Sequence, residues 1–126
     1  MSRACRRDQG QASVELALVL PLVVFLLLTL VQGGLLVRDQ ILVTHAAREA
    51  ARAAALDDDI AAMEAAATSA GPLHADRMQV DISGRHGAGS QFTVRVTYRA
   101  PTNVPLVGQL LGDFALHASA SMRAER

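Results

Sequence analysis

A single carboxylate, Glu15, stands directly before the most apolar stretch of the chain. The residues ahead of it include Arg3, Arg6 and Arg7, and the 22 residues from Leu16 to Val37 carry no charge. A lone carboxylate at the edge of an apolar segment is costly to bury and usually has a specific partner. Glu15 is therefore either a charge with a dedicated partner or an interfacial carboxylate that reaches toward water.

The residues before Glu15 add a second pattern. A basic leader, then Gly10, then a glutamate as the fifth residue after that glycine, then an apolar helix, resembles the signals that a prepilin peptidase cuts. In that class the cut follows the glycine, which implies a mature chain that begins at Gln11. A glycine gives a backbone thin enough to enter a membrane-embedded active site. Such signals often carry an aromatic residue after the glutamate, where this chain has Leu16.

The same resemblance implies a role for Glu15 in assembly. Cleavage would leave a positive amine on Gln11, and a glutamate one helical turn into a neighbouring subunit can neutralise it. On this interpretation Glu15 sets the register between subunits.

No other group of residues points to catalysis or to a cofactor. The run Asp57 to Asp59 lacks the further spaced ligands of a calcium loop, so a solvated turn that caps a helix is the better interpretation. Four histidines are present: His45, His74, His86 and His117. They are far apart and lack metal-ligand spacing. The arginines form no cluster beyond the leader, which argues against nucleic-acid binding. We expect no enzyme, metal, cofactor or small-molecule substrate.

The uncharged segment from Leu16 to Val37 predicts a transmembrane helix. At 1.5 Å per residue it would be about 33 Å long, which matches the roughly 30 Å core of a bilayer. The segment is apolar on every face, and the rest of the 126-residue chain is too small to surround it. A cleavable signal peptide would have a shorter apolar core that ends in a small-x-small site, which Val31 to Gly34 fits poorly.

The charges on either side of this segment predict its orientation. The leader arginines are opposed only by Asp8, whereas Arg38 and Asp39 offset each other on the far side. Positive residues favour the cytoplasmic side of a membrane. We therefore expect residues 1–10 to be a basic leader in the cytoplasm, the helix to cross a bacterial inner membrane once, and the C-terminal part to be exported.

Pro21 lies inside the apolar run and removes one backbone hydrogen bond from the helix. Membranes tolerate such a residue when neighbours satisfy the freed carbonyl. It predicts either a harmless kink or a point at which the helix loosens when a subunit leaves the bilayer for a fibre.

The stretch GQASVELALVLPLVVFLLLTLVQGGLLVRDQILVTHAAREAARAAA resembles the TadE-like family of tight-adherence (Tad), or Flp, pilus assembly proteins. The resemblance is carried by Glu15, by Pro21 six residues later, by an exit from the apolar run that contains Gln and Gly, and by AAREAAR at Ala46 to Arg52. It covers roughly residues 10 to 55. It implies a pseudopilin-like subunit that works with an Flp pilin, a sister pseudopilin, an inner-membrane Tad platform, a secretion ATPase and a prepilin peptidase.

Beyond the membrane, Arg38 to Leu56 contains good helix formers without Pro or Gly, so residues 11–56 predict one transmembrane and extended helix. Its outer part carries a stripe of small residues: Ala46, Ala47, Ala50, Ala51, Ala54 and Ala55. Small residues permit close helix packing. The stripe packs either on the chain's own domain or on sister subunits.

Residues 57–126 predict a small exported domain. Asp59 suits the N-cap of a second helix that Gly71-Pro72 stops. Apolar and polar residues then alternate over Met78 to Ser83, Phe92 to Arg99 and Phe114 to Met122, with a helical turn near Leu106 to Leu111. The expected fold class is α+β: a long N-terminal helix packed on a three-stranded antiparallel sheet, as in pilins.

Two functions follow from these features. The first is a membrane-anchored pseudopilin-like subunit that takes part in assembly of a Tad/Flp-type pilus or a related secretion system. The second is a membrane-tethered binding module, outside the cytoplasm, that has no role in assembly.

Overall fold

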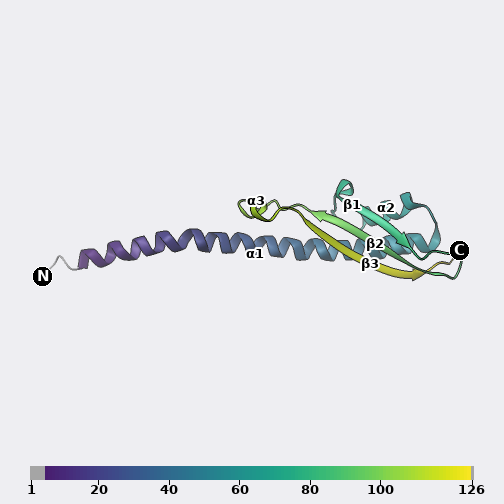
Figure 1. Cartoon of the computed structure of the whole chain (residues 1–126), viewed down its shortest axis with the longest axis horizontal. Helices are drawn as coiled ribbons and strands as arrows, with labels where there is room; N and C mark the ends of the chain where they lie inside the picture. Colours follow the sequence, from purple (N-terminus) through teal and green to yellow (C-terminus); the bar gives the residue numbers. More distant parts are fainter. Residues whose placement is uncertain (1–4, 126) are drawn as a thin grey trace.

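The computed structural model describes residues 5–125, with side chains from residue 10 onward. Its first element is a single helix, α1, from Cys5 to Leu56 (Figure 1). At 1.5 Å per residue this helix is about 80 Å long. Arg3 and the other residues of the predicted leader up to position 4 lie outside the described residues. The helix begins inside the predicted leader, five residues earlier than Gly10.

The remaining elements form a small domain around the second half of α1 (Figure 1). They are α2 (Ile60–Ser69), the short 3-10 helix η1 (Ala75–Arg77), β1 (Met78–Ser83), β2 (Gln91–Ala100), α3 (Val107–Leu111) and β3 (Phe114–Arg123). The predicted α+β class with a three-stranded antiparallel sheet is confirmed.

The start of α2 follows the predicted cap. Asp59 has an extended backbone, and its Oδ1 accepts a hydrogen bond from the backbone N–H of Ala61 at 3.0 Å. This bond satisfies one of the amide groups that a helix start leaves without an internal partner. The helix ends at Ser69, just before Gly71, and a side chain at Gly71 would collide with Leu42 of α1.

The three strands pair in the order β1-β2-β3, with every neighbouring pair antiparallel. In this register Val80 lies opposite Val96, and Val96 lies opposite Ala118. Because side chains alternate between the two faces of a strand, the apolar residues of all three strands share one face. The other face is polar and carries, for example, the hydrogen bond between Thr93 and Ser121.

The apolar face of the sheet is covered by the second half of α1 and by α2. The helix α1 contacts β2 and β3, whereas α2 contacts α1 and β1. The largest fully buried side chains are Phe92, Met63, Val43, Val94, Val96 and Val107. Gln40 of α1 also donates a hydrogen bond to the backbone carbonyl of His117 at 2.9 Å, which ties β3 to the helix.

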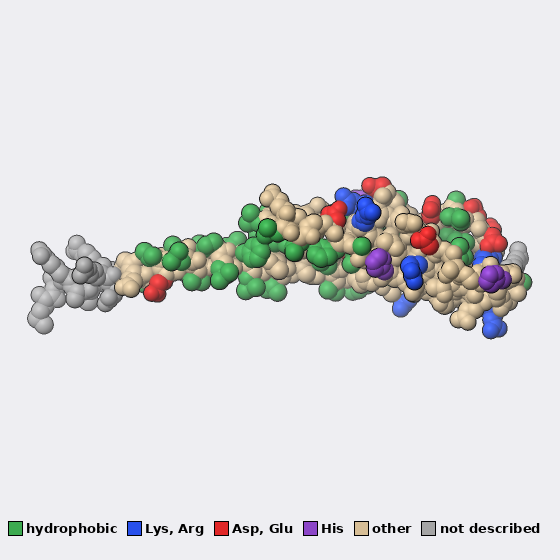
Figure 2. All heavy atoms as spheres, in the orientation of Figure 1, with side chains coloured by type: hydrophobic (Ala, Val, Ile, Leu, Met, Phe, Trp, Pro, Cys, Tyr) green, Lys and Arg blue, Asp and Glu red, His purple; other side chains and the backbone are tan. Residues whose placement is uncertain are grey.

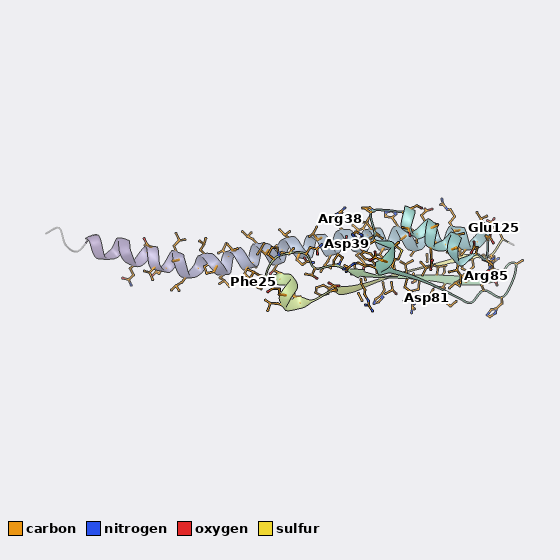
Figure 3. The ribbon with its side chains drawn as sticks, turned by 90° about the horizontal axis from the view of Figure 1, so that it is seen from above. Phe25, Arg38, Asp39, Asp81, Arg85 and Glu125 are labelled. Atoms are coloured by element: carbon orange, nitrogen blue, oxygen red, sulfur yellow. The ribbon has the colours of Figure 1, made fainter. Side chains whose placement is uncertain are left out.

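Arg85, in the turn between β1 and β2, fastens the sheet to the end of α1 (Figure 3). Its side chain is only 10% exposed, and its Nε lies 2.6 Å from Oδ1 of Asp58. Its guanidinium also donates to the carbonyls of Ala54 and Asp57 and lies 5.7 Å from the ring centre of Phe92. The last carbonyls of a helix lack internal partners, so this arginine satisfies acceptors at the point where α1 ends.

We expect Arg85→Ala to lower the free energy of unfolding of the domain by about 1–3 kcal/mol, because charge-assisted bonds to partly buried carbonyls are lost. The measurement is thermal or denaturant unfolding of the full chain in detergent. Arg52→Ala is the matched control, since Arg52 is 72% exposed and lies 4.0 Å from Glu49. It should cost less than about 0.5 kcal/mol. Equal losses for the two variants would contradict the role of Arg85.

Candidate assembly surface on the long helix

The helix α1 consists of an uncovered first part and a packed second part. Nearly every described side chain from Gly10 to Val31 is exposed, and only Leu28 is half-buried. Figure 2 shows this part as a thin rod, largely of hydrophobic side chains, that projects from the domain. Among the described residues, one helical stretch, Gly10–Leu56, is long and apolar enough to cross a membrane.

The exposed apolar side chains of this rod cannot be left in water. Each Leu or Val that is fully exposed forgoes about 1.5–3 kcal/mol relative to a buried one. The rod has many of them, among them Leu16, Leu18, Leu22, Leu26 and Leu30. The domain covers none of these positions, so another apolar phase must do so.

The predicted cleavage and assembly residues lie on this uncovered part. Gly10 and Gln11 are exposed within α1, and a side chain at Gly10 would meet no atom within 4 Å. Glu15 is also exposed, and it has no ion pair with the described residues. These three residues are therefore on one open helical segment.

Pro21 lies inside α1, and the helix continues on both sides of it (Figure 1). Proline has no backbone N–H, so the carbonyl of Ala17, four residues earlier, has no helical donor. The freed carbonyl is less than one turn from Glu15. Two hydrogen-bond acceptors, the backbone carbonyl of Ala17 and the carboxylate of Glu15, thus lie near each other at the start of the apolar run.

The stripe of alanines lies on the packed part of α1 and is buried inside the chain. Ala46, Ala47, Ala50, Ala51 and Ala54 are at most 1% exposed, and Ala55 is 7% exposed. They belong to the core that contains Phe92, Val94 and Val96 of β2. Of the two alternatives, the structure favours packing on the chain's own domain, because the small side chains let α1 approach the sheet closely.

Sequence reasoning missed Gln32, which is 3% exposed although its neighbours Val31 and Gly33 are exposed. Its side-chain oxygen Oε1 is buried without a hydrogen-bond partner among the described residues. α3 contacts α1 in this region (Figure 3). A polar residue inside an apolar run was the available signal, because such residues in a membrane segment usually face protein.

Among the side chains that the structure describes, from residue 10 onward, no group of three or more His, Asp or Glu residues is arranged to hold a metal ion.

A family model described as TadE, TadE-like protein, matches residues 10–52. The match confirms the resemblance seen around Glu15, Pro21 and the alanine-rich stretch. It covers the uncovered part of α1 and most of its packed part, and it ends before α2. No curated protein and no solved structure matches the chain.

If the alanine stripe holds α1 against the sheet, Ala50→Leu should destabilise the domain by about 1–3 kcal/mol or more, because extra methyl groups overpack a closed core. Unfolding of the full chain in detergent measures this. Ala65→Leu is the control, since Ala65 lies exposed on α2 and has room for a larger side chain. A stability equal to that of the unchanged protein for Ala50→Leu would instead leave the stripe free for other subunits.

Proposed function

We propose that the chain is a membrane-anchored, pseudopilin-like subunit that takes part in assembly of a Tad/Flp-type pilus or a related secretion system. The observation that supports this best is the uncovered apolar part of α1, which coincides with the TadE-like match. The chain has a compact domain at one end and a bare hydrophobic rod at the other (Figure 2). A lipid bilayer can cover the apolar side chains of such a rod. In a fibre, the rods of neighbouring subunits can cover one another instead.

The proposed topology places residues 1–10 in the cytoplasm and the domain outside it. The uncharged run from Leu16 to Val37 matches the thickness of a bilayer core. The arginine-rich leader lies on one side, and the balanced pair Arg38 and Asp39 lies on the other. This asymmetry supports an N-terminus on the cytoplasmic side of a bacterial inner membrane.

A role in assembly, rather than tethering alone, is supported by the exposed Glu15. In a bilayer or an apolar fibre core, a carboxylate without a partner is costly, and a positive group close to it lowers that cost. The amine of a neighbouring chain that begins at Gln11 is such a group. Glu15 of one subunit and Gln11 of the next would then fix the axial offset between two helices.

The proposed partners follow from the same arrangement. A prepilin peptidase would cut between Gly10 and Gln11, where the open, exposed end of α1 can unwind because helix ends fray. Other pilin or pseudopilin subunits would pack on the apolar rod, and an inner-membrane Tad platform would move the subunit. The domain's alanine stripe takes no part in these contacts, since it is buried.

Cleavage is tested by the intact mass of the protein extracted from membranes of a host that contains the peptidase. We expect loss of residues 1–10. Gly10→Val should block the loss, because a branched side chain thickens the backbone at the cut, whereas Gly34→Val, at another open glycine of α1, should not. Retention of the leader in the unchanged protein would favour a tethered binding module over a pseudopilin.

Removal of the carboxylate in Glu15→Ala should abolish assembly and leave membrane insertion intact, because only the pairing with a neighbouring amine is lost. Assembly is measured as recovery of pili or of the subunit complex, and insertion as access of protease to the domain in spheroplasts. Glu49→Ala removes a carboxylate from the outer part of α1 and serves as the control. Normal assembly of Glu15→Ala would refute the proposed role of Glu15.

A further inference from the structure

The loop between β2 and β3, which we call the leucine loop (residues 101–113), carries exposed apolar side chains. Leu106, Leu110 and Leu111 are 57%, 71% and 55% exposed. Val104 and Val107 of the same loop are buried and face inward. The loop therefore has an inner apolar side, which packs on the protein, and an outer apolar side, which the described chain leaves uncovered.

The leucine loop lies at the level of the apolar part of α1. Figures 1 and 3 both place α3 beside the helix, and Figure 3 shows it between Phe25 and the pair Arg38 and Asp39. The buried Gln32 is six residues before Arg38, which is about 9 Å along the helix axis. In Figure 2 the hydrophobic side chains around α3 adjoin those of the rod. The loop thus extends the apolar surface of α1 sideways.

The shape of the loop is fixed by its own bonds. Leu106 has φ +67° and ψ −46°, and the N–H of Val107 donates to the carbonyl of Pro105 at 2.8 Å. This is a γ-turn of the kind that is rare and strained, and a leucine with positive φ is unusual. Strain of this kind persists where the surroundings impose it. Here it presents Leu106 outward instead of into the core.

Polar contacts brace the base of the loop. Nη1 of Arg77 lies 3.1 Å from Oδ2 of Asp113. Oδ1 of Asp113 accepts a hydrogen bond from the backbone N–H of Thr102 at 3.4 Å. The hydroxyl of Thr102 donates to the carbonyl of Gly112. A side chain at Gly108 would collide with the carbonyl of Thr102, so only glycine allows this close approach. These contacts hold the loop in a defined conformation, and the three leucines are exposed in that conformation.

We propose that the leucine loop is a second membrane contact, in which Leu106, Leu110 and Leu111 insert among the lipid acyl chains on the side of the bilayer that faces the domain. The proposal rests on the membrane span under Proposed function. An apolar helical face typically enters about 5–10 Å into the boundary between headgroups and acyl chains, which agrees with the depth of Gln32 below Arg38. Gln32 then faces the loop, as polar residues of membrane helices usually face protein.

Lipid is a better occupant of this surface than another subunit for a reason of position. The loop sits on the side of α1, next to the proposed span, so its leucines are continuous with a surface that would contact acyl chains while the subunit is in the bilayer. The exposed loop positions Asn103 and Gln109 can at the same time reach the polar headgroups. Such a contact would limit the tilt of the domain over the membrane.

The test uses tryptophan fluorescence, because the chain has no native tryptophan. Leu110→Trp, in the full chain reconstituted in phosphatidylcholine and phosphatidylglycerol vesicles, should be quenched by lipids that are brominated high in their acyl chains. Phe25→Trp is the reference for the span. Leu56→Trp, at the exposed far end of α1, is the reference for water. Leu111→Trp is a second reporter on the loop, and circular dichroism checks that every variant folds.

We expect Leu110→Trp and Leu111→Trp to be quenched at least as strongly as Phe25→Trp, which lies deeper in the span, and Leu56→Trp to keep its emission. Quenching of Phe25→Trp alone would overturn the lipid contact and leave the span intact, as it would if another subunit covered the leucines. Absence of quenching at all four positions would overturn the span and the loop contact together. Quenching at Leu56→Trp as well would overturn the proposal, because the whole domain would then lie on the bilayer.

Discussion

The constraint on which this structure depends is the transfer of apolar surface out of water along one helix. α1 is a single element, yet its two parts satisfy this constraint differently. The second part is covered by a sheet and by α2, whereas the first part has no cover within the described chain. A chain of this size cannot fold around a helix of that length, so the surroundings must complete its burial.

The residue types along α1 reflect this division. Large aliphatic side chains fill the uncovered part, which is long and apolar enough to cross a membrane and has no partner of fixed shape within the described chain. Alanines fill the packed part, where the partner is a rigid sheet and the helix must come close. Most of the largest core side chains that face this stripe come instead from β2, such as Phe92, Val94 and Val96. The small side chains on the packed face of α1 therefore complement the large side chains on the facing side of the sheet.

Much of the fold could be predicted because its signals are local. Strict alternation predicted all three strands to within two residues at each end, and the cap at Asp59 predicted the start of α2. The partner of the alanine stripe could not be predicted, since small residues suit a sheet and a sister helix equally well. The display of Leu106 depends on a positive φ that no leucine signals, and the burial of Gln32 comes from tertiary packing that its local sequence does not specify.

The end of α1 carries several separate attachments. Arg85 binds carbonyls there, and the N–H of Glu125 donates to the carbonyl of Ala55 at 3.1 Å, so both the first hairpin and the last strand are fixed to the same turn. These attachments lie at the tip of the domain that is farthest from the rod (Figure 1). An axial load applied at the rod therefore travels through the whole helix and strains the helix–sheet contact in shear. Such a contact must slip along its full length at once before the helix can move relative to the sheet.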